Sequence, residues 1–484
     1  MAIFHWTGNA ATGSFAKAGN WDPAANAPPG PSDVAIIANA AMPITGTGTA
    51  NVLNFGGTNK VEGHLTAMYG CPVNENLTLL PGATLTTPKL HIVVDFGPNP
   101  PTTGIAKVTV GNHSRVVISG CNPPDTYAIQ IAETIANVAE SHGTLVVQGA
   151  HAVVNGGNMP MSVGQDGTGL LTIRDGAEVS VGNGDPIKYP WALVIGNHPQ
   201  SNGTVEVSHG SLLAHGQVIV GRYSTGKLDV HQGGLVVAES MAIGWAPDSG
   251  LGDQGKGSVT VKGSDACLIV DNSLQVGHMG VGSLTVTEHG FVSAGIAINV
   301  NGALSLADGQ IETSALGVNE GATLTGHGTV IASAGLNING GAITAHQQLN
   351  LIGDIDNAGT ITVAAGGDLR CFGTLLDDQG SIELQANSVA SLEAVASGQT
   401  ITFAGNNAKL VLRNAGDFGG TIMDFGPTHS IELEAEATGH NFDIPSSTLT
   451  LTGPGANVVA KLLMKGLTST SFNVVPGPTT LITV

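Results

Sequence analysis

The sequence predicts an all-β protein, a single-stranded parallel β-helix (solenoid) with an N-terminal cap and a less regular C-terminal β region. Glycine supplies 70 of the 484 residues, while charged residues make up 11% and aromatic residues 4%. Glycine is roughly twice as frequent as in an ordinary globular protein, which favours many tight turns. Short runs of alternating apolar and polar residues indicate strands. These runs recur in a similar order along the chain.

The recurring unit is clearest in residues 143–400, which we assign as regular β-helix. One example is GSLTVTEHGFVSAG from Gly282, in which we expect Leu284, Val286 and Phe291 to point inward. The shortest spacing between units is about 20 residues, enough for three short strands and one coil of a β-helix, with coils stacked about 4.8 Å apart. The units begin at Gly143, Gly169, Gly203, Gly226, Gly257, Gly282, Gly302, Gly321, Gly341, Gly359 and Gly380.

Several units contain a third element, an apolar residue followed by glycine. Insertions follow that glycine at 197–202 and 245–256, or precede its strand at 182–191. Equivalent points of stacked repeats lie on one side of a solenoid, where repeat proteins usually place binding surfaces. The pairs are Val163-Gly164, Ile195-Gly196, Val220-Gly221, Ile243-Gly244 and Val276-Gly277.

The N-terminal part of the chain departs from this pattern. Residues 1–48 contain Trp6, Trp21 and a proline-rich stretch, and we assign them as a cap because a solenoid end exposes apolar side chains and unpaired strand edges. Residues 49–142 fit the template loosely, as irregular β-helix. Within them, the pattern of 127–141 is compatible with either a short helix or an irregular repeat.

Residues 401–484 keep the alternation of strands but lose the regular spacing. This C-terminal β region either closes the second end or pairs with another copy of the chain. The apolar, uncharged ending TTLITV motivates the second alternative, a head-to-tail filament in which the chain is its own partner.

The composition argues against several partners. The net charge is −20 with only 16 Lys and Arg, so a phosphate backbone would be repelled and we expect no nucleic-acid partner. No apolar run reaches the ~18 residues of a membrane span. The opening MAIFHWTGNAATGSF lacks the basic and apolar regions of a signal peptide. Export without a cleaved leader, a replaced leader and an intracellular location all remain open.

The four cysteines have no metal-binding spacing. Cys71 and Cys121 could pair in an oxidising compartment, while burial of all four as small apolar side chains is the favoured interpretation.

The segments GTLVV, GLLTIRDGAEVSVG, ALVIGNHPQSNGTVEVSHGSLLA and GSLTVTEHGFVSAG resemble the strand-loop-strand repeats of autotransporter passenger domains. The stretches HWTG, GNWDP and PGPSDVAII are similar to the front of such bacterial surface proteins. The resemblance covers residues 143–340 well. It implies a right-handed β-helix, secreted or displayed on the bacterial surface, that works as an adhesin, biofilm component or similar structure. It carries over no functional residues, because packing defines these repeats.

Histidine and aspartate share one turn position of the repeats. Both tolerate left-handed backbone angles, so turn formation is the favoured role for this position. A histidine ladder that binds metal or charges in acid is the alternative. Because no two histidines have ligand spacing on one strand, we predict no metal and no cofactor. The residues are Asp175, His209, His231, His289 and Asp308.

Aromatic residues gather beside the insertions. Two of the four tryptophans and two of the four tyrosines fall there, and flat aromatic faces with polar neighbours suit sugar rings. The alternative is that these rings cover backbone. The candidate carbohydrate-binding residues are Tyr189, Trp191, Arg222, Tyr223 and Trp245.

No catalytic motif is present in the sequence. It contains no GxSxG, HExxH or P-loop pattern, and we assign no catalytic residue; Glu432, Glu434 and Glu436 alternate on one face of a strand, typical of a solvated edge. We therefore expect an extracellular structural or adhesive protein, with a self-assembling fibre or biofilm matrix component as specific forms. The alternative is a β-helix that binds or degrades polysaccharide.

Overall fold

The structure is a computed structural model, and the chain divides into two compact units. The N-terminal unit comprises Met1–Asp271 and Gly277–Ser283, and the C-terminal unit comprises Asn272–Val276 and Leu284–Val484. The described residues are 1–22, 27–94, 104–119, 127–134, 141–182, 191–245, 255–376, 379–467 and 469–484.

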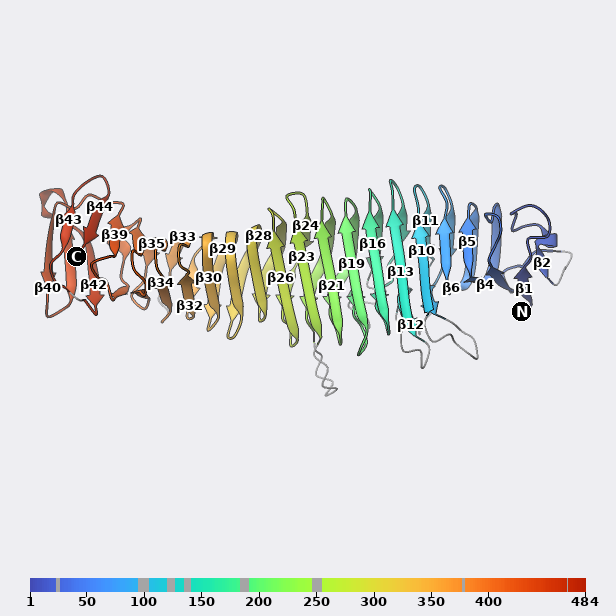
Figure 1. The fold of residues 1–484 in the computed structure, drawn as a ribbon, viewed down its shortest axis with the longest axis horizontal. Helices are drawn as coiled ribbons and strands as arrows, with labels where there is room; N and C mark the ends of the chain where they lie inside the picture. Colours follow the sequence, from blue (N-terminus) through green and yellow to red (C-terminus); the bar gives the residue numbers. More distant parts are fainter. Residues whose placement is uncertain are drawn as a thin grey trace. The chain divides into compact units, whose positions relative to one another are not determined.

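The described part of the chain is all-β, and most of its strands pair in parallel (Figure 1). Three short 3-10 turns are its helical elements: η1 (Ala18–Asn20), η2 (Ala415–Asp417) and η3 (Pro454–Ala456). The first 24 strands are β1 (Ile3–Trp6), β2 (Trp21–Asp22), β3 (Val34–Ala38), β4 (Thr47–Gly56), β5 (Thr58–Val61), β6 (His64–Val73), β7 (Asn76–Leu79), β8 (Thr84–Thr87), β9 (Leu90–Val94), β10 (Gly104–Val110), β11 (Arg115–Ile118), β12 (Ile129–Thr134), β13 (Ser141–Gln148), β14 (Val153–Asn155), β15 (Met161–Val163), β16 (Thr168–Arg174), β17 (Glu178–Gly182), β18 (Trp191–Ile195), β19 (Asn202–Ser208), β20 (Ser211–Val220), β21 (Thr225–His231), β22 (Leu235–Ile243), β23 (Lys256–Lys262) and β24 (Cys267–Val270). The others are β25 (Ser273–Val276), β26 (Val281–Thr287), β27 (Phe291–Val300), β28 (Ala303–Asn319), β29 (Thr323–Asn339), β30 (Ala342–Ile352), β31 (Ile355–Asn357), β32 (Thr360–Val363), β33 (Asp368–Leu375), β34 (Ser381–Leu384), β35 (Val389–Val395), β36 (Thr400–Phe403), β37 (Lys409–Leu412), β38 (Thr421–Met423), β39 (Ser430–Leu433), β40 (Gly439–Asp443), β41 (Thr448–Thr452), β42 (Val458–Lys465), β43 (Asn473–Val475) and β44 (Thr480–Thr483).

In the N-terminal unit most strands after the first two pair in parallel with the equivalent strand of the next repeat. β13, β16, β19, β21 and β23 form one such parallel series, side by side in Figure 1. The glycines that begin the repeats are aligned in it: Gly143, Gly169, Gly203, Gly226 and Gly257. Two positions further on, an aliphatic residue is buried in every strand of the series: Leu145, Leu171, Val205, Leu228 and Val259. The recurrence seen in the sequence therefore sets the register of the strands.

The C-terminal unit has the same arrangement over shorter repeats. β28 pairs with β29 and β29 with β30 in parallel, and one aliphatic side chain per repeat forms a continuous buried column. Its members are Leu304, Leu324, Ile343, Ile361, Ile382, Ile401 and Ile422.

One expectation about local structure is wrong, and one open alternative is decided in part. Phe291 was expected to point inward, but Val292 is the buried residue and Phe291 is only half-buried. Glu288 and His289 both have positive φ, at 52° and 66°, so the turn uses one residue more than expected and reverses the alternation that follows. Of the two alternatives for 127–141, the irregular repeat holds for Ile129–Thr134, which is strand β12 with a bulge beside Ala132.

The N-terminal segment folds back on the first parallel strands. β1 pairs with β2 antiparallel and with β3 in parallel. Trp21 is buried with its ring 4.8 Å from Phe15 and 5.0 Å from Trp6, and its Nε1 donates a 2.9 Å hydrogen bond to the Phe15 carbonyl. The Phe15 ring occupies the space in which Gly48 would carry a side chain, so the aromatic cluster packs directly on β4.

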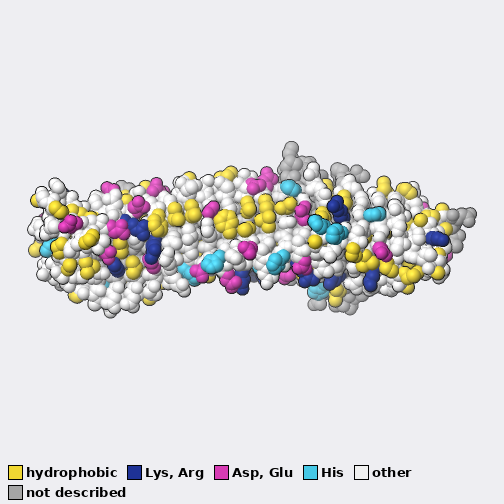
Figure 2. Space-filling view, turned by 90° about the horizontal axis from the view of Figure 1, so that it is seen from above, with side chains coloured by type: hydrophobic (Ala, Val, Ile, Leu, Met, Phe, Trp, Pro, Cys, Tyr) yellow, Lys and Arg dark blue, Asp and Glu magenta, His cyan; other side chains and the backbone are white. Residues whose placement is uncertain are grey.

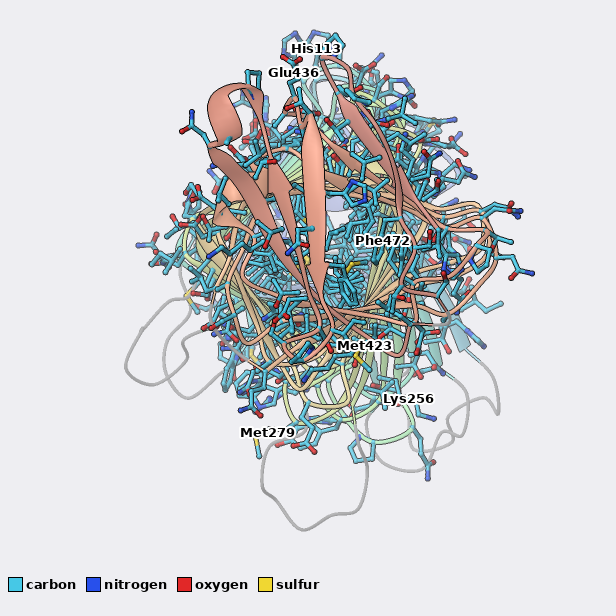
Figure 3. The ribbon with its side chains drawn as sticks, turned by 90° about the vertical axis from the view of Figure 1, so that its left-hand side faces the viewer. His113, Lys256, Met279, Met423, Glu436 and Phe472 are labelled. Carbon is cyan, nitrogen blue, oxygen red and sulfur yellow. The ribbon has the colours of Figure 1, made fainter. Side chains whose placement is uncertain are left out.

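The C-terminal strands switch from parallel to antiparallel pairing. β41 lies antiparallel between β40 and β42, and β44 pairs antiparallel with β39. The segment TTLITV therefore pairs within its own chain: Ile482 is buried, and Thr480 Oγ1 accepts a 2.7 Å bond from Ala437 N and donates a 2.8 Å bond to Ala435 O. Phe472, labelled in Figure 3, packs 5.2 Å from Phe442 in the same region.

Figure 2 shows charged side chains scattered singly or in small groups over one face, most of which carries no charge. No helix among the residues that the structure describes is long and apolar enough to cross a membrane.

Candidate functional site

A column of glycines shapes one edge of the N-terminal unit. These are the glycines of the apolar-glycine pairs, and all have left-handed φ values between +69° and +81°. At Gly196 an added Cβ would overlap the Thr225 carbonyl oxygen and lie 2.7 Å from the Thr225 carbonyl carbon. Only glycine fits this corner. The residues that directly follow these glycines are Gln165, Asn197, Arg222, Trp245 and His278.

The outer face of the strands that lead into this edge is buried. Four outward positions are aligned on β15, β18, β20 and β22 and are at most 1% exposed: Ser162, Val194, Ile219 and Ala242. Tyr127 packs on two of them, Val194 and Ile219, and the Trp191 and Trp245 rings pack against the same cluster. This side of the unit therefore has a small second core outside the main one.

Arg222 is the central charged group of the edge. Its guanidinium carbon lies 4.4 Å from the centre of the Trp191 ring and 4.9 Å from the centre of the Tyr223 ring, and Nη1 donates a 3.0 Å hydrogen bond to Asn197 Oδ1. A cation at this distance from an aromatic face is stabilised by about 0.5–2 kcal/mol. Arg222 therefore contacts a face of each of these rings.

A chain of polar side chains continues from Arg222 across the repeats. Asn197 Nδ2 donates a 2.7 Å hydrogen bond to Gln165 Oε1, and Gln165 Nε2 lies 3.3 Å from His198 Nε2. Because an amide nitrogen can only donate, His198 Nε2 accepts, and Nδ1 carries the proton that faces Asp166 Oδ1. The network thus connects a guanidinium to a carboxylate through two amides and an imidazole.

This network does not make a hydrolytic triad. The Asp166–His198 pair resembles the orienting half of one, but His198 Nε2, which would activate a nucleophile, faces Gln165. The nearest hydroxyl in the network, Ser201 Oγ, donates 2.7 Å to the His198 carbonyl. The geometry fits a structural or binding role.

Tyr127 is the most perturbed group of the edge. Burial raises the pKa of its phenol to about 12, and the neighbouring Arg222 guanidinium, Asn197 and Trp191 partly oppose the rise. The Tyr127 hydroxyl and Arg222 Nε are both buried without a partner in hydrogen-bonding geometry. Such atoms are uncommon in native proteins, and because Tyr127 is only 2% exposed, its hydroxyl is enclosed by its protein neighbours.

The predicted carbohydrate-binding residues are partly brought together. Trp191, Arg222 and Tyr223 form one stacked group, and Trp245 shares the Tyr127 cluster while its ring lies 5.7 Å from His278. Tyr189 lies outside the described residues. Sequence reasoning missed Tyr127 and the amide network. The sequence did contain a signal for the network, because Gln165, Asn197 and Arg222 each directly follow a glycine of the apolar-glycine pairs.

The turn position of the repeats adopts the backbone that was predicted for it, with one exception. Positive φ values of 60°, 50°, 66° and 60° occur at Asp175, His209, His289 and Asp308. His231 is the exception, because its neighbour Gln232 has the positive φ, at 48°. No group of three or more metal-ligating side chains occurs within the described ranges.

The described cysteines differ in burial. Cys71 and Cys371 are fully buried and Cys267 is half-buried. Burial raises the pKa of the Cys71 thiol, and it raises that of Cys371 to about 12. Cys121, the other member of the suggested disulfide, lies outside the described residues.

Comparison with known proteins gives little further information. No protein-family model matches the chain, and no curated protein matches it. Among solved structures, a TibC-catalysed, hyper-glycosylated fragment of TibA covers 78% of this chain and 97% of its own length, with 13% identity and a TM-score of 0.25. A likeness at this level supports no argument about function.

Proposed function

We propose that this chain is a right-handed, single-stranded parallel β-helix that serves outside the cell, secreted or on a bacterial surface, as a structural or adhesive scaffold. The supporting observation is the register of the repeats, in which glycine is aligned with glycine and aliphatic with aliphatic over the equivalent strands of five successive repeats. In such a stack each inner strand satisfies its backbone groups on both sides. A scaffold built this way stays rigid and resists proteolysis, because opening one inner strand breaks its backbone hydrogen bonds to both neighbouring strands.

The proposal includes self-assembly of the chain, but through strand edges other than the one suggested by the sequence. A filament joined through TTLITV is disfavoured, because β44 is already paired with β39. The edges left for strand addition in the described C-terminal strands are β40, which pairs with β41, and β43, which pairs with β44. β43 carries Val475, which is 48% exposed, and unprotected edges of this kind promote pairing between copies.

Display of the chain on a non-adherent bacterial host tests the adhesive role. We expect cells that carry it to settle faster and to stay on a surface under flow. The matched control carries Gly196→Ala and Gly221→Ala, which disturb two corners of the stack while leaving the surface chemistry nearly unchanged. Equal settling and retention of the two cell populations, at equal display measured with an antibody, would contradict the proposal.

A second candidate function is carbohydrate binding at the glycine edge. It is favoured by the half-buried aromatic residues Tyr223 and Trp245. Screening on a glycan array, with Trp245→Ala beside the unchanged chain, tests it. A signal that survives Trp245→Ala and Tyr223→Ala would place binding elsewhere on the molecule.

A further inference from the structure

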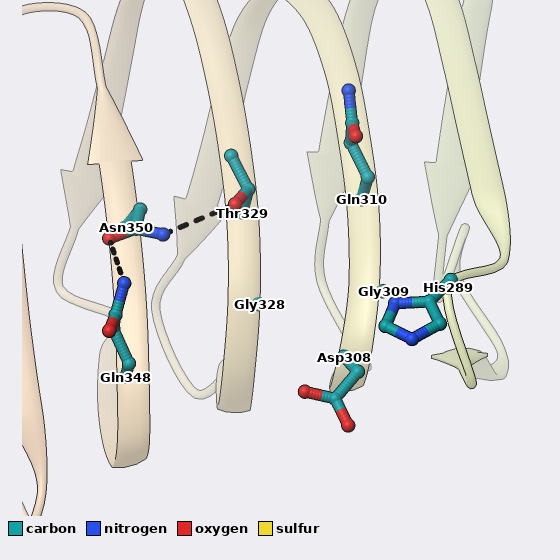
Figure 4. Close-up of a pocket in the computed structure, with 8 residues that line it drawn as sticks. All are labelled: His289, Asp308, Gly309, Gln310, Gly328, Thr329, Gln348 and Asn350. Atoms are coloured by element: carbon teal, nitrogen blue, oxygen red, sulfur yellow. Dashed lines mark hydrogen bonds between the residues drawn. The ribbon is translucent and has the colours of Figure 1, made fainter.

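A polar groove crosses consecutive repeats of the C-terminal unit (Figure 4). Its volume is about 390 Å³, within the range of small-molecule sites. It is separate from the glycine edge described above. Of the candidate residues from the sequence, only the turn residues His289 and Asp308 line it. The lining residues are His289, Asp308, Gly309, Gln310, Gly328, Thr329, Gln348 and Asn350.

A row of hydrogen-bonding side chains forms the wall of the groove. Gln310 on β28, Thr329 on β29 and Asn350 on β30 occupy aligned positions of three adjacent strands, so they repeat about every 4.8 Å. Phe291 on β27 is aligned with Gln310, so its half-buried ring extends the row past the residues that line the groove. The wall therefore consists of three uncharged polar groups, with one aromatic ring beyond its end.

The floor of the groove is backbone. Gly309 and Gly328 are aligned on neighbouring strands. A Cβ on Gly328, whose φ is +136°, would overlap the Gly309 carbonyl oxygen. Because neither position accepts a side chain, the space beside the polar row stays open.

The polar row is only partly satisfied by its own members. Asn350 Nδ2 donates a 3.3 Å bond to Thr329 Oγ1, and Gln348 Nε2 donates a 3.2 Å bond to Asn350 Oδ1. Gln310 Nε2 donates a 2.7 Å bond to Glu312. In the part of the chain that the structure describes, the Oε1 atoms of Gln310 and Gln348 accept no hydrogen bond. A carboxamide offers two donors and an acceptor with two lone pairs, so each keeps capacity for a ligand.

The charge of the groove points to an uncharged ligand. No Lys or Arg lines it, and its carboxylate, Asp308, lies 3.5 Å from His327 Nε2. An anionic ligand would face that carboxylate and the net charge of −20. A peptide is disfavoured as well, because β28 and β29 already pair on both sides and leave no edge for strand addition.

We propose that this groove binds a neutral oligosaccharide. Sugar hydroxyls both donate and accept, which matches carboxamide and hydroxyl partners, and the apolar face of a sugar ring packs on an aromatic ring. The oligosaccharide lies across the strands, so that successive sugar units meet Asn350, Thr329 and Gln310 and an end unit meets Phe291. This binding site goes beyond the scaffold role and does not depend on the glycine edge.

Isothermal titration of the full chain tests the proposal with four neutral probes, maltohexaose, cellohexaose, laminarihexaose and mannohexaose, and one anionic probe, hexagalacturonic acid. We expect at least one neutral hexasaccharide to bind and the anionic one to bind at least about tenfold more weakly. The double variant Gln310→Ala/Asn350→Ala removes two hydrogen-bonding groups and is expected to weaken binding by about tenfold to a hundredfold. Thr329→Val keeps the shape and the strand preference, and it gives a second measure if the double variant is unstable.

The matched control is Gln275→Ala, which removes an outward carboxamide of β25 in the same unit but outside the groove. Circular dichroism and the thermal midpoint verify folding of each variant. Absence of binding by all four neutral probes would overturn the proposal. Equal binding by the double variant, Thr329→Val and the unchanged chain would also overturn it. A loss of binding in Tyr223→Ala but not in Thr329→Val would assign the sugar to the glycine edge instead.

Discussion

The loss of stability on adding a single methyl group tests how closely the repeats are stacked at the glycine edge. In Gly196→Ala the new Cβ overlaps the Thr225 carbonyl oxygen and lies 2.7 Å from its carbon. Relief requires the two repeats to separate locally, and this strains the 2.7 Å bond from Gly221 N to Ile195 O and the 3.0 Å bond from Arg222 N to Gly196 O. The left-handed backbone costs alanine about 1–2 kcal/mol, and overpacking adds about 1–3 kcal/mol.

Gly82→Ala is the matched control, because Gly82 belongs to the same unit and has φ +83°, but no atom lies within 4 Å of its added Cβ. Alanine at position 82 therefore has only the cost of the left-handed backbone. This cost is reduced by about 0.4–1 kcal/mol, because alanine makes the unfolded chain less flexible than glycine does. We expect urea unfolding, followed by circular dichroism, to give a loss of about 2–4 kcal/mol for Gly196→Ala and about 1 kcal/mol or less for Gly82→Ala. Hydrogen exchange in β18 and β21 should accelerate only in the first variant. Equal losses in the two variants would refute close stacking as the reason for glycine at this corner.

Three further predictions follow from burial and pairing. Folding raises the pKa of the Tyr127 phenol to about 12, from about 10 in the unfolded chain. The folded state therefore holds this proton more tightly. The resulting contribution to stability is complete below about pH 10 and is lost as the pH rises from about 10 to 12. Absorbance titration should show one late phenol that is absent in Tyr127→Phe, and in Arg222→Ala this phenol should titrate still later. A thiol reagent should label half-buried Cys267 before Cys371, whose burial raises its pKa to about 12; equal labelling rates would contradict the burial. Ile482→Asp places a charge in the contact between β44 and β39. The change should release β44 and cause concentration-dependent association in sedimentation velocity, whereas a monomer at all concentrations would show that the edge of β39 is not adhesive.

The repeating glycines were sufficient to predict the register of the N-terminal unit. Gly143 pairs with Gly169, and Gly169 with Gly203, because a residue that must fit a crowded corner recurs once per repeat. Local turns were less predictable. At Phe291 a second left-handed residue in the preceding turn reversed the inward and outward positions, and at His231 the turn moved by one residue.

The candidate site was predictable only as a region. The aromatic residues beside the insertions indicated the edge, and Trp191, Arg222 and Tyr223 do stack there. The hydrogen bond between Gln165 and Asn197 joins residues 32 positions apart, a separation set by an insertion and not by the repeat. Tyr127 comes from a segment whose pattern was ambiguous between helix and strand, and only its packing on Val194 and Ile219 reveals its role.

The aligned aliphatic column of the C-terminal unit has a genetic consequence. Leu304, Leu324 and Ile343 occupy the same place in successive repeats, and each repeat recognises its neighbour through the same few contacts. An unequal crossover that removes or copies about 20 codons between two such positions would join one repeat to another with a nearly identical partner surface. The number of repeats in this part of the gene can therefore change in a single step, while point mutations at the glycine corners of the N-terminal unit remain costly.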